Sequence, residues 1–275
     1  MEKNTEAALE NKPIFLKLGG SLLTDKTGFE QVREDVLNRV AAEIASARLE
    51  RPNLRLVLGH GSGSFGHVHA SKHGTRQGVN TVEEWQGFAI VSDSALRLNR
   101  IVVHALLDKG IPAVSISPSA SAVVQDGQVK YLGTASLTAA LNAGLVPVIH
   151  GDVAFDQIRG GTILSTEEVM GYLIDALSPR TILLAGETAG VYDEQGKVIP
   201  RITPQNFEEI KSALGGSRGA DVTGGMAAKV QDVLDLAVSQ PGMTVRIFGG
   251  LTDGAIKNML LELSSSVGTV VDAGH

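Results

Sequence analysis

Short apolar runs alternate with amphipathic stretches along almost all of this 275-residue chain. The apolar runs have the length of strands, and the stretches between them repeat their apolar residues at helical spacing. Strands joined by helices can lie parallel in one sheet, with helices on both of its faces. We therefore predict an α/β protein: a three-layer αβα sandwich with a mostly parallel open sheet. The expected strands are 13–18, 54–58, 113–116, 146–150, 181–185, 245–248 and 269–271.

Two of the expected helices carry a sequence signature at their N-terminus. Thr81 with Glu84, and Ser165 with Glu168, have the spacing of a capping box, in which two side chains satisfy the free N–H groups of the first turn. The helix after Thr81 is long and extends as far as residue 109. The other expected helices are 30–48, 134–143, 225–238 and 253–263, and 191–202 is typical of a hairpin.

Composition and charge exclude several classes of protein. The chain is 43% hydrophobic and 20% charged, so it can bury a core and is not disordered. Its net charge is −6 without a cluster of Lys and Arg, which argues against a nucleic-acid partner. The absence of Cys excludes disulfides, thiolate metal sites and cysteine nucleophiles. No apolar run reaches the roughly 18 residues of a membrane span, and the charged start is unlike a signal peptide. We expect a soluble cytoplasmic protein with no membrane partner.

No linker, repeat or low-complexity segment divides the chain. We expect residues 1–12 to form a loose N-terminal extension. Residues 13–275 are then one domain with two lobes. The first lobe spans 13–177 and the second 178–275.

Glycine-rich stretches follow the first two expected strands, where open α/β sheets bind their ligands. They are KLGGSLLTDK, residues 17–26, and GHGSGSFGH, residues 59–67. Glycines let the backbone come close to a phosphate, and the N–H groups of such turns bind anions. Lys17 and Lys26 add positive charge, and His67, expected at the start of a helix, can donate a hydrogen bond to a phosphate oxygen.

Two more polar sites follow later strands. Gly151 and Asp152 come directly after 146–150, and DVTGGMAAK, residues 221–229, opens a helix that carries Lys229. Each feature alone also fits an ordinary turn, loop or surface residue. Three glycine-rich loops, three lysines, a histidine and an aspartate on one sheet instead indicate a site for a highly anionic group. Phosphoryl transfer needs mainly such positioning and positive charge.

A second interpretation rests on 61–66, which fits the dinucleotide-binding pattern GxGxxG. It would make the chain a nicotinamide-dependent oxidoreductase. However, the pattern follows the second strand, and the acidic residues at the right distance, Glu83 and Glu84, fall at a helix start. This interpretation also leaves 17–26 and 221–229 unexplained. No Walker A sequence is present.

Five stretches resemble the amino acid kinase superfamily, in its order and over nearly the whole chain. They are KLGGSLLTDK, GSFGH, HGD at 150–152, GVYD at 190–193 and TGGMAAK at 223–229. The histidine of GSFGH is similar to that of isopentenyl phosphate kinases and of the related fosfomycin kinases. The resemblance implies ATP-dependent phosphorylation of isopentenyl phosphate by direct in-line transfer. A fosfomycin-type kinase, or another small phosphate or phosphonate kinase, is the alternative.

The resemblance also implies partners and an architecture. Members of the superfamily use Mg²⁺ and are commonly homodimers, often through the long helix that here starts at Thr81. Apart from the resemblance, Phe88 and Ile90 in that helix are candidates that would favour an apolar acceptor tail, although plain core packing is the more common role for either residue. A non-catalytic nucleotide-binding regulator on the same fold is a further possibility, but such proteins usually lose part of the site, and here its residues are all present.

On the nucleotide side, the resemblance assigns the phosphates, the adenosine and the transferred group to separate stretches. Lys26 would stabilise the transferring phosphoryl group. The residues implied to bind ATP are Lys17, Gly19, Gly20, Ser21, Gly63, Gly186, Gly190, Tyr192, Asp193, Gly225 and Lys229.

On the acceptor side, the backbone of Gly61, Ser62 and Gly63 would cradle the acceptor phosphate or the transferred group. His67 would donate a hydrogen bond to the acceptor phosphate, and Asp152 would orient the lysines. The catalytic residues implied are therefore Lys17, Lys26, His67, Asp152 and Lys229.

Two positions depart from the superfamily pattern. Ser62 replaces the middle glycine of the usual HGGGSFGH, so this loop is expected to differ slightly, because serine tolerates fewer backbone conformations than glycine. Ser165, Thr166 and Glu167 replace the usual Ser-Gly-Asp. This replacement weakens the case for a carboxylate there that contacts a metal or a lysine.

Overall fold

The structure, a computed structural model, describes residues 12–25, 27–214, 225–240, 242–263 and 265–274. Residues 1–11 of the expected extension lie outside these ranges, as do Lys26 and residues 221–224 of the glycine-rich stretch 221–229. In the described part of the chain one large sheet has eight strands. They are β1 (Ile14–Leu18), β2 (Leu56–His60), β3 (Ala113–Ser115), β6 (Val146–His150), β9 (Thr181–Gly186), β10 (Arg201–Ile202), β11 (Thr244–Gly249) and β12 (Thr269–Val271).

The order of this sheet is β10-β12-β11-β9-β1-β2-β6-β3. Its strands pair in parallel except for β11 and β12, which are antiparallel. The prediction of a mostly parallel open sheet is therefore confirmed. β1 lies in the middle of the sheet, which explains why its whole length is apolar apart from Lys17.

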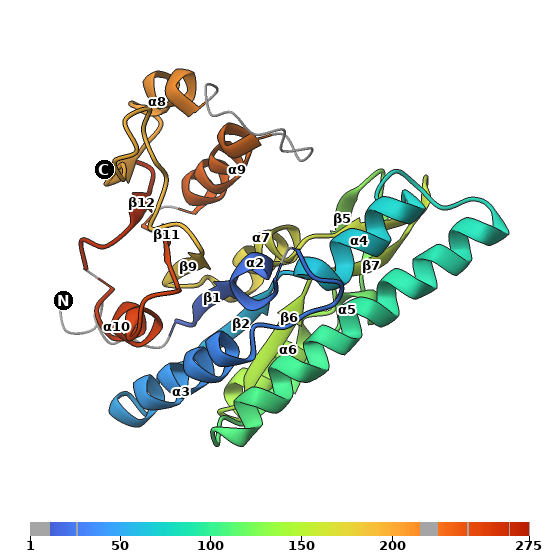
Figure 1. The fold of residues 1–275 in the computed structure, drawn as a ribbon, viewed down its shortest axis with the longest axis horizontal. Coiled ribbons are helices and arrows are strands. Elements are labelled where there is room, and N and C mark those ends of the chain that lie inside the picture. Colours follow the sequence, from blue (N-terminus) through green and yellow to red (C-terminus); the bar gives the residue numbers. More distant parts are fainter. Residues whose placement is uncertain (1–11, 26, 215–224, 241, 264, 275) are drawn as a thin grey trace.

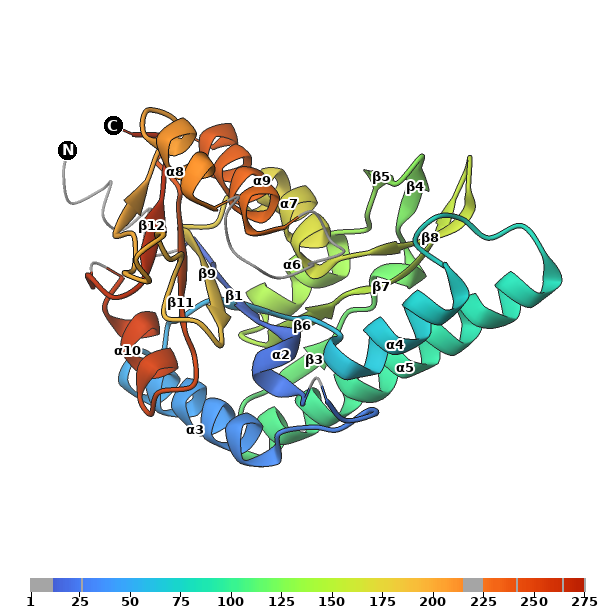
Figure 2. The ribbon, with the colours of Figure 1, turned by 45° about the horizontal axis from the view of Figure 1, so that its top comes forward.

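Helices cover both faces of the sheet, as Figures 1 and 2 show. Ile14, Leu16 and Leu18 of β1 pack in one buried cluster with α3, α5 and α10, whereas Phe15 packs in the other with α6, α7 and α9. This alternation is the period of two expected of a strand with two buried faces. The helices are α2 (Gly20–Leu23), α3 (Glu34–Glu50), α4 (Gly63–His73), α5 (Val82–Asp108), α6 (Ala135–Asn142), α7 (Thr166–Leu177), α8 (Phe207–Leu214), α9 (Gly225–Ser239) and α10 (Ala255–Leu261).

Both capping boxes predicted from the sequence are present. Thr81 accepts the N–H of Glu84 at the start of α5, and Ser165 accepts that of Glu168 at the start of α7, with the reciprocal bonds also made. Two boundaries were wrong: the helix expected from residue 30 begins at Glu34, and the strand expected at 54–58 is Leu56–His60.

A second, four-stranded sheet was not predicted. Its order is β5-β4-β7-β8, with β4 (Val123–Gln125), β5 (Gln128–Tyr131), β7 (Asp152–Asp156) and β8 (Gly160–Leu164). It lies beside α4 and α5 (Figure 2). β4 and β5 have three and four residues and are partly exposed. β7 has an aspartate at each end and β8 begins with two glycines, so neither has the continuous apolar run expected of a buried strand.

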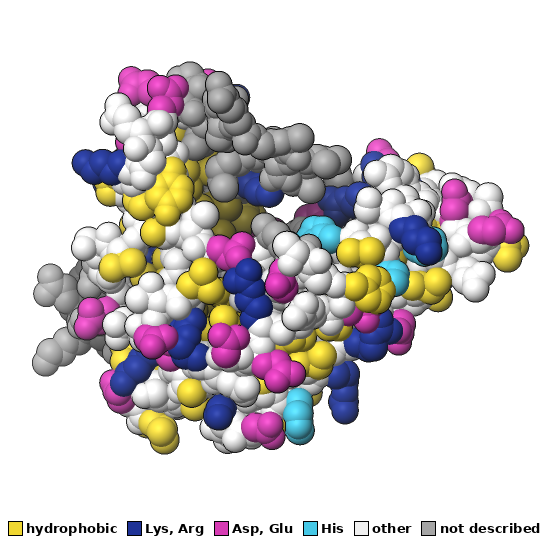
Figure 3. Space-filling view, in the orientation of Figure 1, with side chains coloured by type: hydrophobic (Ala, Val, Ile, Leu, Met, Phe, Trp, Pro, Cys, Tyr) yellow, Lys and Arg dark blue, Asp and Glu magenta, His cyan; other side chains and the backbone are white. Residues whose placement is uncertain are grey.

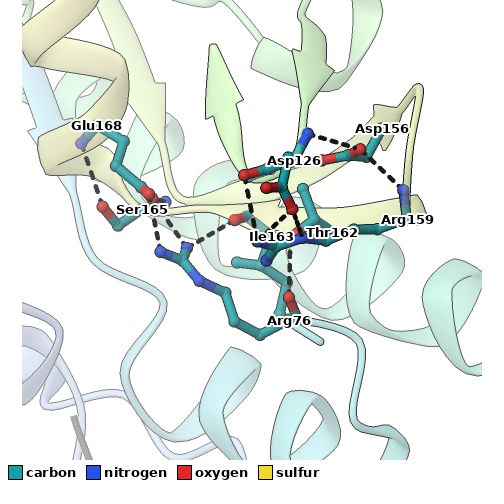
Figure 4. A network of polar contacts seen from close by, with 9 residues as sticks. Arg76, Asp126, Asp156, Arg159, Thr162, Ile163, Ser165 and Glu168 are labelled. Atoms are coloured by element: carbon teal, nitrogen blue, oxygen red, sulfur yellow. Dashed lines mark hydrogen bonds and ion pairs between the residues drawn. The ribbon is translucent and has the colours of Figure 1, made fainter. Parts of the chain in front are cut away.

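The carboxylate of Asp156 holds the turns of this second sheet together (Figure 4). Burial raises the pKa of Asp156, but hydrogen bonds from four backbone N–H groups outweigh burial and lower that pKa to about 2. The donors are Asp126, Gly127, Ile158 and Arg159. One carboxylate thus fixes two turns, 126–127 and 158–159, against each other.

Candidate active site

Five neighbouring parallel strands end in register at one edge of the main sheet. Leu18 of β1 is paired with His60 of β2 and with Ala185 of β9, His60 is paired with His150 of β6, and Gly186 with Gly249 of β11. The loops that follow these strands therefore start side by side. This carboxyl edge is where open parallel sheets bind ligands.

The two glycine-rich turns after β1 and β2 are in direct contact. A Cβ placed on Gly20 would lie 2.4 Å from the nitrogen of Gly63, and one on Gly61 would lie 2.8 Å from the nitrogen of Gly20. Thr24 ties the turns together, since its hydroxyl accepts the N–H of Ser64 at 2.9 Å and donates to the carbonyl of Gly20 at 2.8 Å. Any side chain at Gly20 or Gly61 would force the turns apart.

The second turn has the backbone geometry of an anion-binding nest. Ser62 is right-handed, with φ −80° and ψ −12°, and Gly63 is left-handed, with φ +48°. A right-handed residue followed by a left-handed one points successive N–H groups into one concavity. The expected distortion at Ser62 does not arise, because any residue adopts its conformation. The position that requires glycine is Gly63.

The stretch predicted as a loop continues directly into α4. This helix begins at Gly63, so His67 lies in its second turn rather than at its start, as the sequence had suggested. The reason is Phe65, which is buried in the core beneath α4 and makes 63–66 helical. The His67 side chain is exposed and on the same short helix as the nest.

Lys17, near the end of β1, forms an ion pair with Glu167 in the first turn of α7. The Lys17 side chain is only 15% exposed. Burial raises the pKa of Glu167, but the ammonium of Lys17, with a smaller contribution from Lys229, outweighs burial and holds that pKa below its ordinary value. Glu167 therefore carries its negative charge between two lysines that lie more than 200 positions apart in the chain.

The start of α7 lies close to Lys17 because a hydrogen bond and close packing against a glycine hold it on β2. The Thr166 hydroxyl donates to the carbonyl of His60 at 2.7 Å. Gly59 leaves room for this approach, since a Cβ there would lie 2.7 Å from the methyl carbon of Thr166 and 2.6 Å from Met170. The sequence reasoning missed Glu167, because the usual aspartate of the superfamily is absent. The signal that could have found it is the capping box at Ser165, which places an acidic first turn near a strand end.

Asp152 is buried at the start of β7, and its carboxylate binds backbone groups. It accepts the N–H of Ser119 at 3.2 Å and that of Val153 at 2.8 Å. The sequence had suggested that Asp152 orients the lysines, whereas the carboxylate that pairs with Lys17 is that of Glu167.

On the nucleotide side, the segments that follow β1 and β11 are both hydrogen-bonded to the end of β9. The N–H of Gly19 donates to the carbonyl of Ala185, and that of Gly250 to the carbonyl of Gly186, both at 2.8 Å. Ser21 lies next in the first turn, in α2. Gly190 is buried against Thr269, where a Cβ would lie 2.7 Å from the hydroxyl.

The remaining candidates of this half follow β9 or lie in the first turns of α9. Tyr192 is 40% exposed, and its hydroxyl accepts the N–H of Ala189 at 3.3 Å. The carboxylate of Asp193 accepts the N–H groups of Gln195 and Lys197, both at 2.9 Å, and so closes the turn of the expected hairpin. Gly225 is the first residue of α9, and Lys229 lies one turn further along.

Figure 3 shows Lys or Arg, Asp or Glu, and His side chains close together between the segments that carry α9 and α4. Within the described ranges, no group of three or more His, Asp or Glu side chains is arranged to hold a metal ion. The same part of the chain contains no helix long and apolar enough to cross a membrane.

Comparison with known proteins gives one consistent result. The model of the amino acid kinase family matches residues 12–249. The chain is 39% identical to an isopentenyl phosphate kinase of Haloferax volcanii over 237 residues, which covers 86% of this chain and 91% of the relative. It is 37% identical to an isopentenyl phosphate kinase of Methanocaldococcus jannaschii over 225 residues, covering 78% and 84%.

Solved structures agree with the sequence comparison. The chain is similar to an X-ray structure of isopentenyl phosphate kinase with a TM-score of 0.78 and 28% identity, covering 94% of this chain and 99% of that one. More distant relatives include an acetylglutamate kinase of Dehalococcoides mccartyi, 27% identical over 288 residues and covering 96% of both chains.

Proposed function

Because this chain belongs to the amino acid kinase family, we propose that it transfers the γ-phosphoryl group of ATP to isopentenyl phosphate, giving isopentenyl diphosphate and ADP. The observation that carries this proposal is the contact between the two glycine turns, with Lys17 beside them. The acceptor is taken from the relatives that cover most of this chain at 33–39% identity, each an isopentenyl phosphate kinase. Acetylglutamate kinases match it at only 24–27%.

The chemistry asks for little beyond positioning and positive charge. An oxygen of the acceptor phosphate attacks the γ-phosphorus of ATP, a new P–O bond forms, and the bond from the γ-phosphorus to the bridging oxygen breaks to release ADP. The attacking oxygen is already ionised, so no strong general base is needed. The transition state spreads negative charge over three equatorial oxygens, which preorganised N–H groups and ammonium groups stabilise.

We assign the acceptor phosphate to the nest at Gly61, Ser62 and Gly63, with His67 donating a hydrogen bond from α4. Lys17 and Lys229 would face the transferred group and the ATP phosphates. Glu167 would hold Lys17 in place, the task that the sequence had given to Asp152. Its ion pair with Lys17 would orient the ammonium, and the reaction written above takes no proton from it. Lys26 keeps its proposed role at the transferring group, although it lies outside the described residues.

The ATP phosphates would bind the turn at Gly19, Gly20 and Ser21 and the start of α9 at Gly225. Adenosine would bind along 186–193. Mg²⁺ usually keeps several waters and binds substrate phosphates with one or two carboxylates. The described residues offer no larger cluster of ligands, which fits a Mg²⁺ ion carried mainly by ATP. The ion would offset charge on the phosphates.

We also propose the division into an acceptor lobe, 13–177, and a nucleotide lobe, 178–275. A homodimer through α5 is supported by the apolar side chains that this helix exposes, among them Ile90, Ile101 and Leu107. Phe88, one candidate for the acceptor tail, is buried against Trp85 and Phe155, with ring centroids 5.2 and 5.3 Å away, as core packing predicts. The cytoplasmic location stays a prediction.

The proposed reaction can be tested by ADP release with isopentenyl phosphate, dimethylallyl phosphate, fosfomycin and N-acetylglutamate as acceptors. Phosphorus NMR of the product should show a diphosphate formed from isopentenyl phosphate, with the highest kcat/KM for that acceptor. A higher kcat/KM for fosfomycin would favour the alternative of a fosfomycin-type kinase. ADP release with none of the four would refute the proposal.

A further inference from the structure

Two buried histidines end neighbouring strands directly beneath the glycine turns. His60 of β2 and His150 of β6 are register partners, and their rings stack with centroids 5.6 Å apart at 16°. Their exposed fractions are 1% and 0%. The reaction proposed above uses neither ring, although both lie at the edge of the sheet that carries the site.

The hydrogen bonds of His60 define its tautomer. Its Nδ1 lies 3.1 Å from the carbonyl oxygen of Gly61, and a carbonyl can only accept, so Nδ1 carries a hydrogen. Burial, with a further contribution from His150, lowers the pKa of His60 to about 3. The ring is therefore neutral at ordinary pH, and its Nε2 has no hydrogen and accepts.

Asn99 of α5 supplies the donor for that second nitrogen. Its amide nitrogen lies 3.1 Å from Nε2 of His60, and its amide oxygen accepts the hydroxyl of Ser115 at 2.5 Å. The Asn99 side chain is 1% exposed. An amide nitrogen can only donate, so Asn99 favours the tautomer in which the hydrogen of His60 faces Gly61.

Fixing the Gly61 carbonyl also fixes the next N–H group. The C=O and N–H of a trans peptide point in opposite directions, so a Gly61 carbonyl held toward His60 turns the N–H of Ser62 away from the ring. Ser62 is the first residue of the nest. The preceding carbonyl, that of His60, is held as well, by the Thr166 hydroxyl at 2.7 Å and the N–H of Gly151 at 3.3 Å. Glycine alone would leave the 61–62 peptide free to rotate.

We infer that His60 is a positioning residue, which in the tautomer selected by Asn99 holds the Gly61–Ser62 peptide with its N–H toward the acceptor phosphate. The assignment of the phosphate rests on the proposed function, whereas the tautomer and the held peptide do not. His150 makes the same contact one strand away, with Nδ1 3.0 Å from the carbonyl of Gly151, and so holds the peptide that leads into Asp152.

The tautomer can be tested without any activity, by nitrogen-15 NMR of protein labelled at histidine. His60 should show a protonated Nδ1 and a bare Nε2 at neutral pH. In Asn99→Asp a carboxylate faces Nε2 while the Gly61 carbonyl still accepts from Nδ1, so the ring should take up a second hydrogen from solvent, at Nε2. A protonated Nε2 in the unchanged protein would overturn the inference. The nitrogen-15 spectrum of the unchanged protein tests the tautomer of His60 even where a variant does not fold.

The effect on the reaction is tested with His60→Leu and His60→Asn, since the amide nitrogen of asparagine can take the place of Nδ1. We expect His60→Leu to raise KM for isopentenyl phosphate about tenfold more than KM for ATP, and His60→Asn to recover most of the loss. Thr181→Val is the control, because it removes a buried 2.8 Å hydrogen bond at the opposite end of the sheet. It should leave both KM values unchanged.

Equal changes in both KM values, or no recovery in His60→Asn, would overturn the inference. If neither the unchanged protein nor any variant phosphorylates isopentenyl phosphate, the proposed function is wrong. The positioning role is then decided by titration with inorganic phosphate. The amide signals of Ser62 and Gly63 should shift in the unchanged protein and in His60→Asn, and much less in His60→Leu. Equal shifts in all three would contradict the role of His60.

Discussion

At the scale of single residues, the site depends on backbone contacts that leave no room for a side chain. Gly20 and Gly61 belong to turns about 40 positions apart, yet each would collide with the backbone of the other turn if it carried a Cβ. A backbone nitrogen cannot move aside as a flexible side chain can. The positive φ of Gly63 adds a second reason for glycine in the same place.

Gly20→Ala is therefore expected to lower kcat/KM by about 100-fold, the scale of a misplacement near 1 Å in an active site. Gly171→Ala is the matched control, because its Cβ would meet only the flexible end of Leu236, at 3.2 Å, within a helix. It should keep full activity and be at least as stable. Near-normal kcat/KM in Gly20→Ala would show that the two turns are not fixed against each other.

A second residue-scale expectation concerns Glu167. Glu167→Gln keeps the shape of the side chain and removes the charge that holds Lys17. We expect kcat to fall roughly tenfold through loss of a preorganised charge. The change in stability should be only about 1 kcal/mol, because the carboxylate is half exposed. Steady-state kinetics at about pH 7.5 measure the change in kcat. Urea unfolding measures the change in the free energy of unfolding.

The control for Glu167 is Glu50→Gln, which breaks the ion pair with Lys257 on the surface far from the strand ends. It should leave kcat unchanged. A loss of stability in Glu167→Gln without any loss of kcat would mean that the Lys17 pair is structural only.

At the scale of elements, the sequence predicted the parts whose signals are local. Both capping boxes and the strands 146–150 and 269–271 are where the pattern placed them. The second sheet was missed, because β4 and β5 are short and the turn between them is held by Asp156, which is 30 positions from Asp126 and 29 from Gly127. The start of α4 was predicted as a loop, because among its glycines and serine Phe65 is the one buried apolar side chain, too little to show a helical period.

The candidate site divides in the same way. Glycine turns and lysines at strand ends can be found in a sequence, but the partner of each turn cannot. Lys17 and Glu167 are 150 positions apart in the sequence, and His60 and Asn99 are 39 apart. Only the folded sheet brings the two residues of each pair together.

The N-terminus of α7, which presents Glu167, is held by Arg76 (Figure 4). Arg76 donates to both oxygens of Glu168, at 2.7 and 2.9 Å, and to the carbonyl of Ile163 at 2.6 Å. A lysine cannot reproduce this two-pronged contact. We expect Arg76→Lys to increase hydrogen exchange at 166–169 and to lower stability by about 1 kcal/mol. Arg201→Lys, which breaks the similar pair with Asp272, should leave exchange in α7 unchanged. Equal exchange in both variants would contradict this role of Arg76.

At the scale of the whole molecule, two buried clusters on opposite faces of one sheet hold the strands whose ends form the site. Any loss of global stability therefore reaches the site. Acid is the clearest such perturbation, because His60 is buried in its neutral form at the end of β2. The pKa of His60 is about 3 in the folded chain, against an ordinary value of 6.5.

The unfolded chain binds a proton at this histidine below pH 6.5, whereas the folded chain does not until about pH 3. Stability should therefore fall as pH decreases between these values, by about 1.4 kcal/mol per pH unit from this group alone. Asp156, with a pKa of about 2 against 3.8, adds a further loss below pH 3.8. Urea unfolding at pH 7 and near pH 5 should differ by about 2 kcal/mol. His60→Asn should show a smaller difference, and an identical difference would contradict the assignment to His60.

The central claim is that glycine turns at neighbouring strand ends form one site, which binds the phosphates of ATP and the phosphate of the acceptor together. The most direct measurement is a crystal structure with isopentenyl phosphate and a non-hydrolysable ATP analogue bound together. The account predicts the acceptor phosphate against the N–H groups of Ser62 and Gly63, and the γ-phosphate between it, Lys17 and the turn at Gly20. Phosphates bound away from the turns at Gly20 and Gly63 would contradict the account.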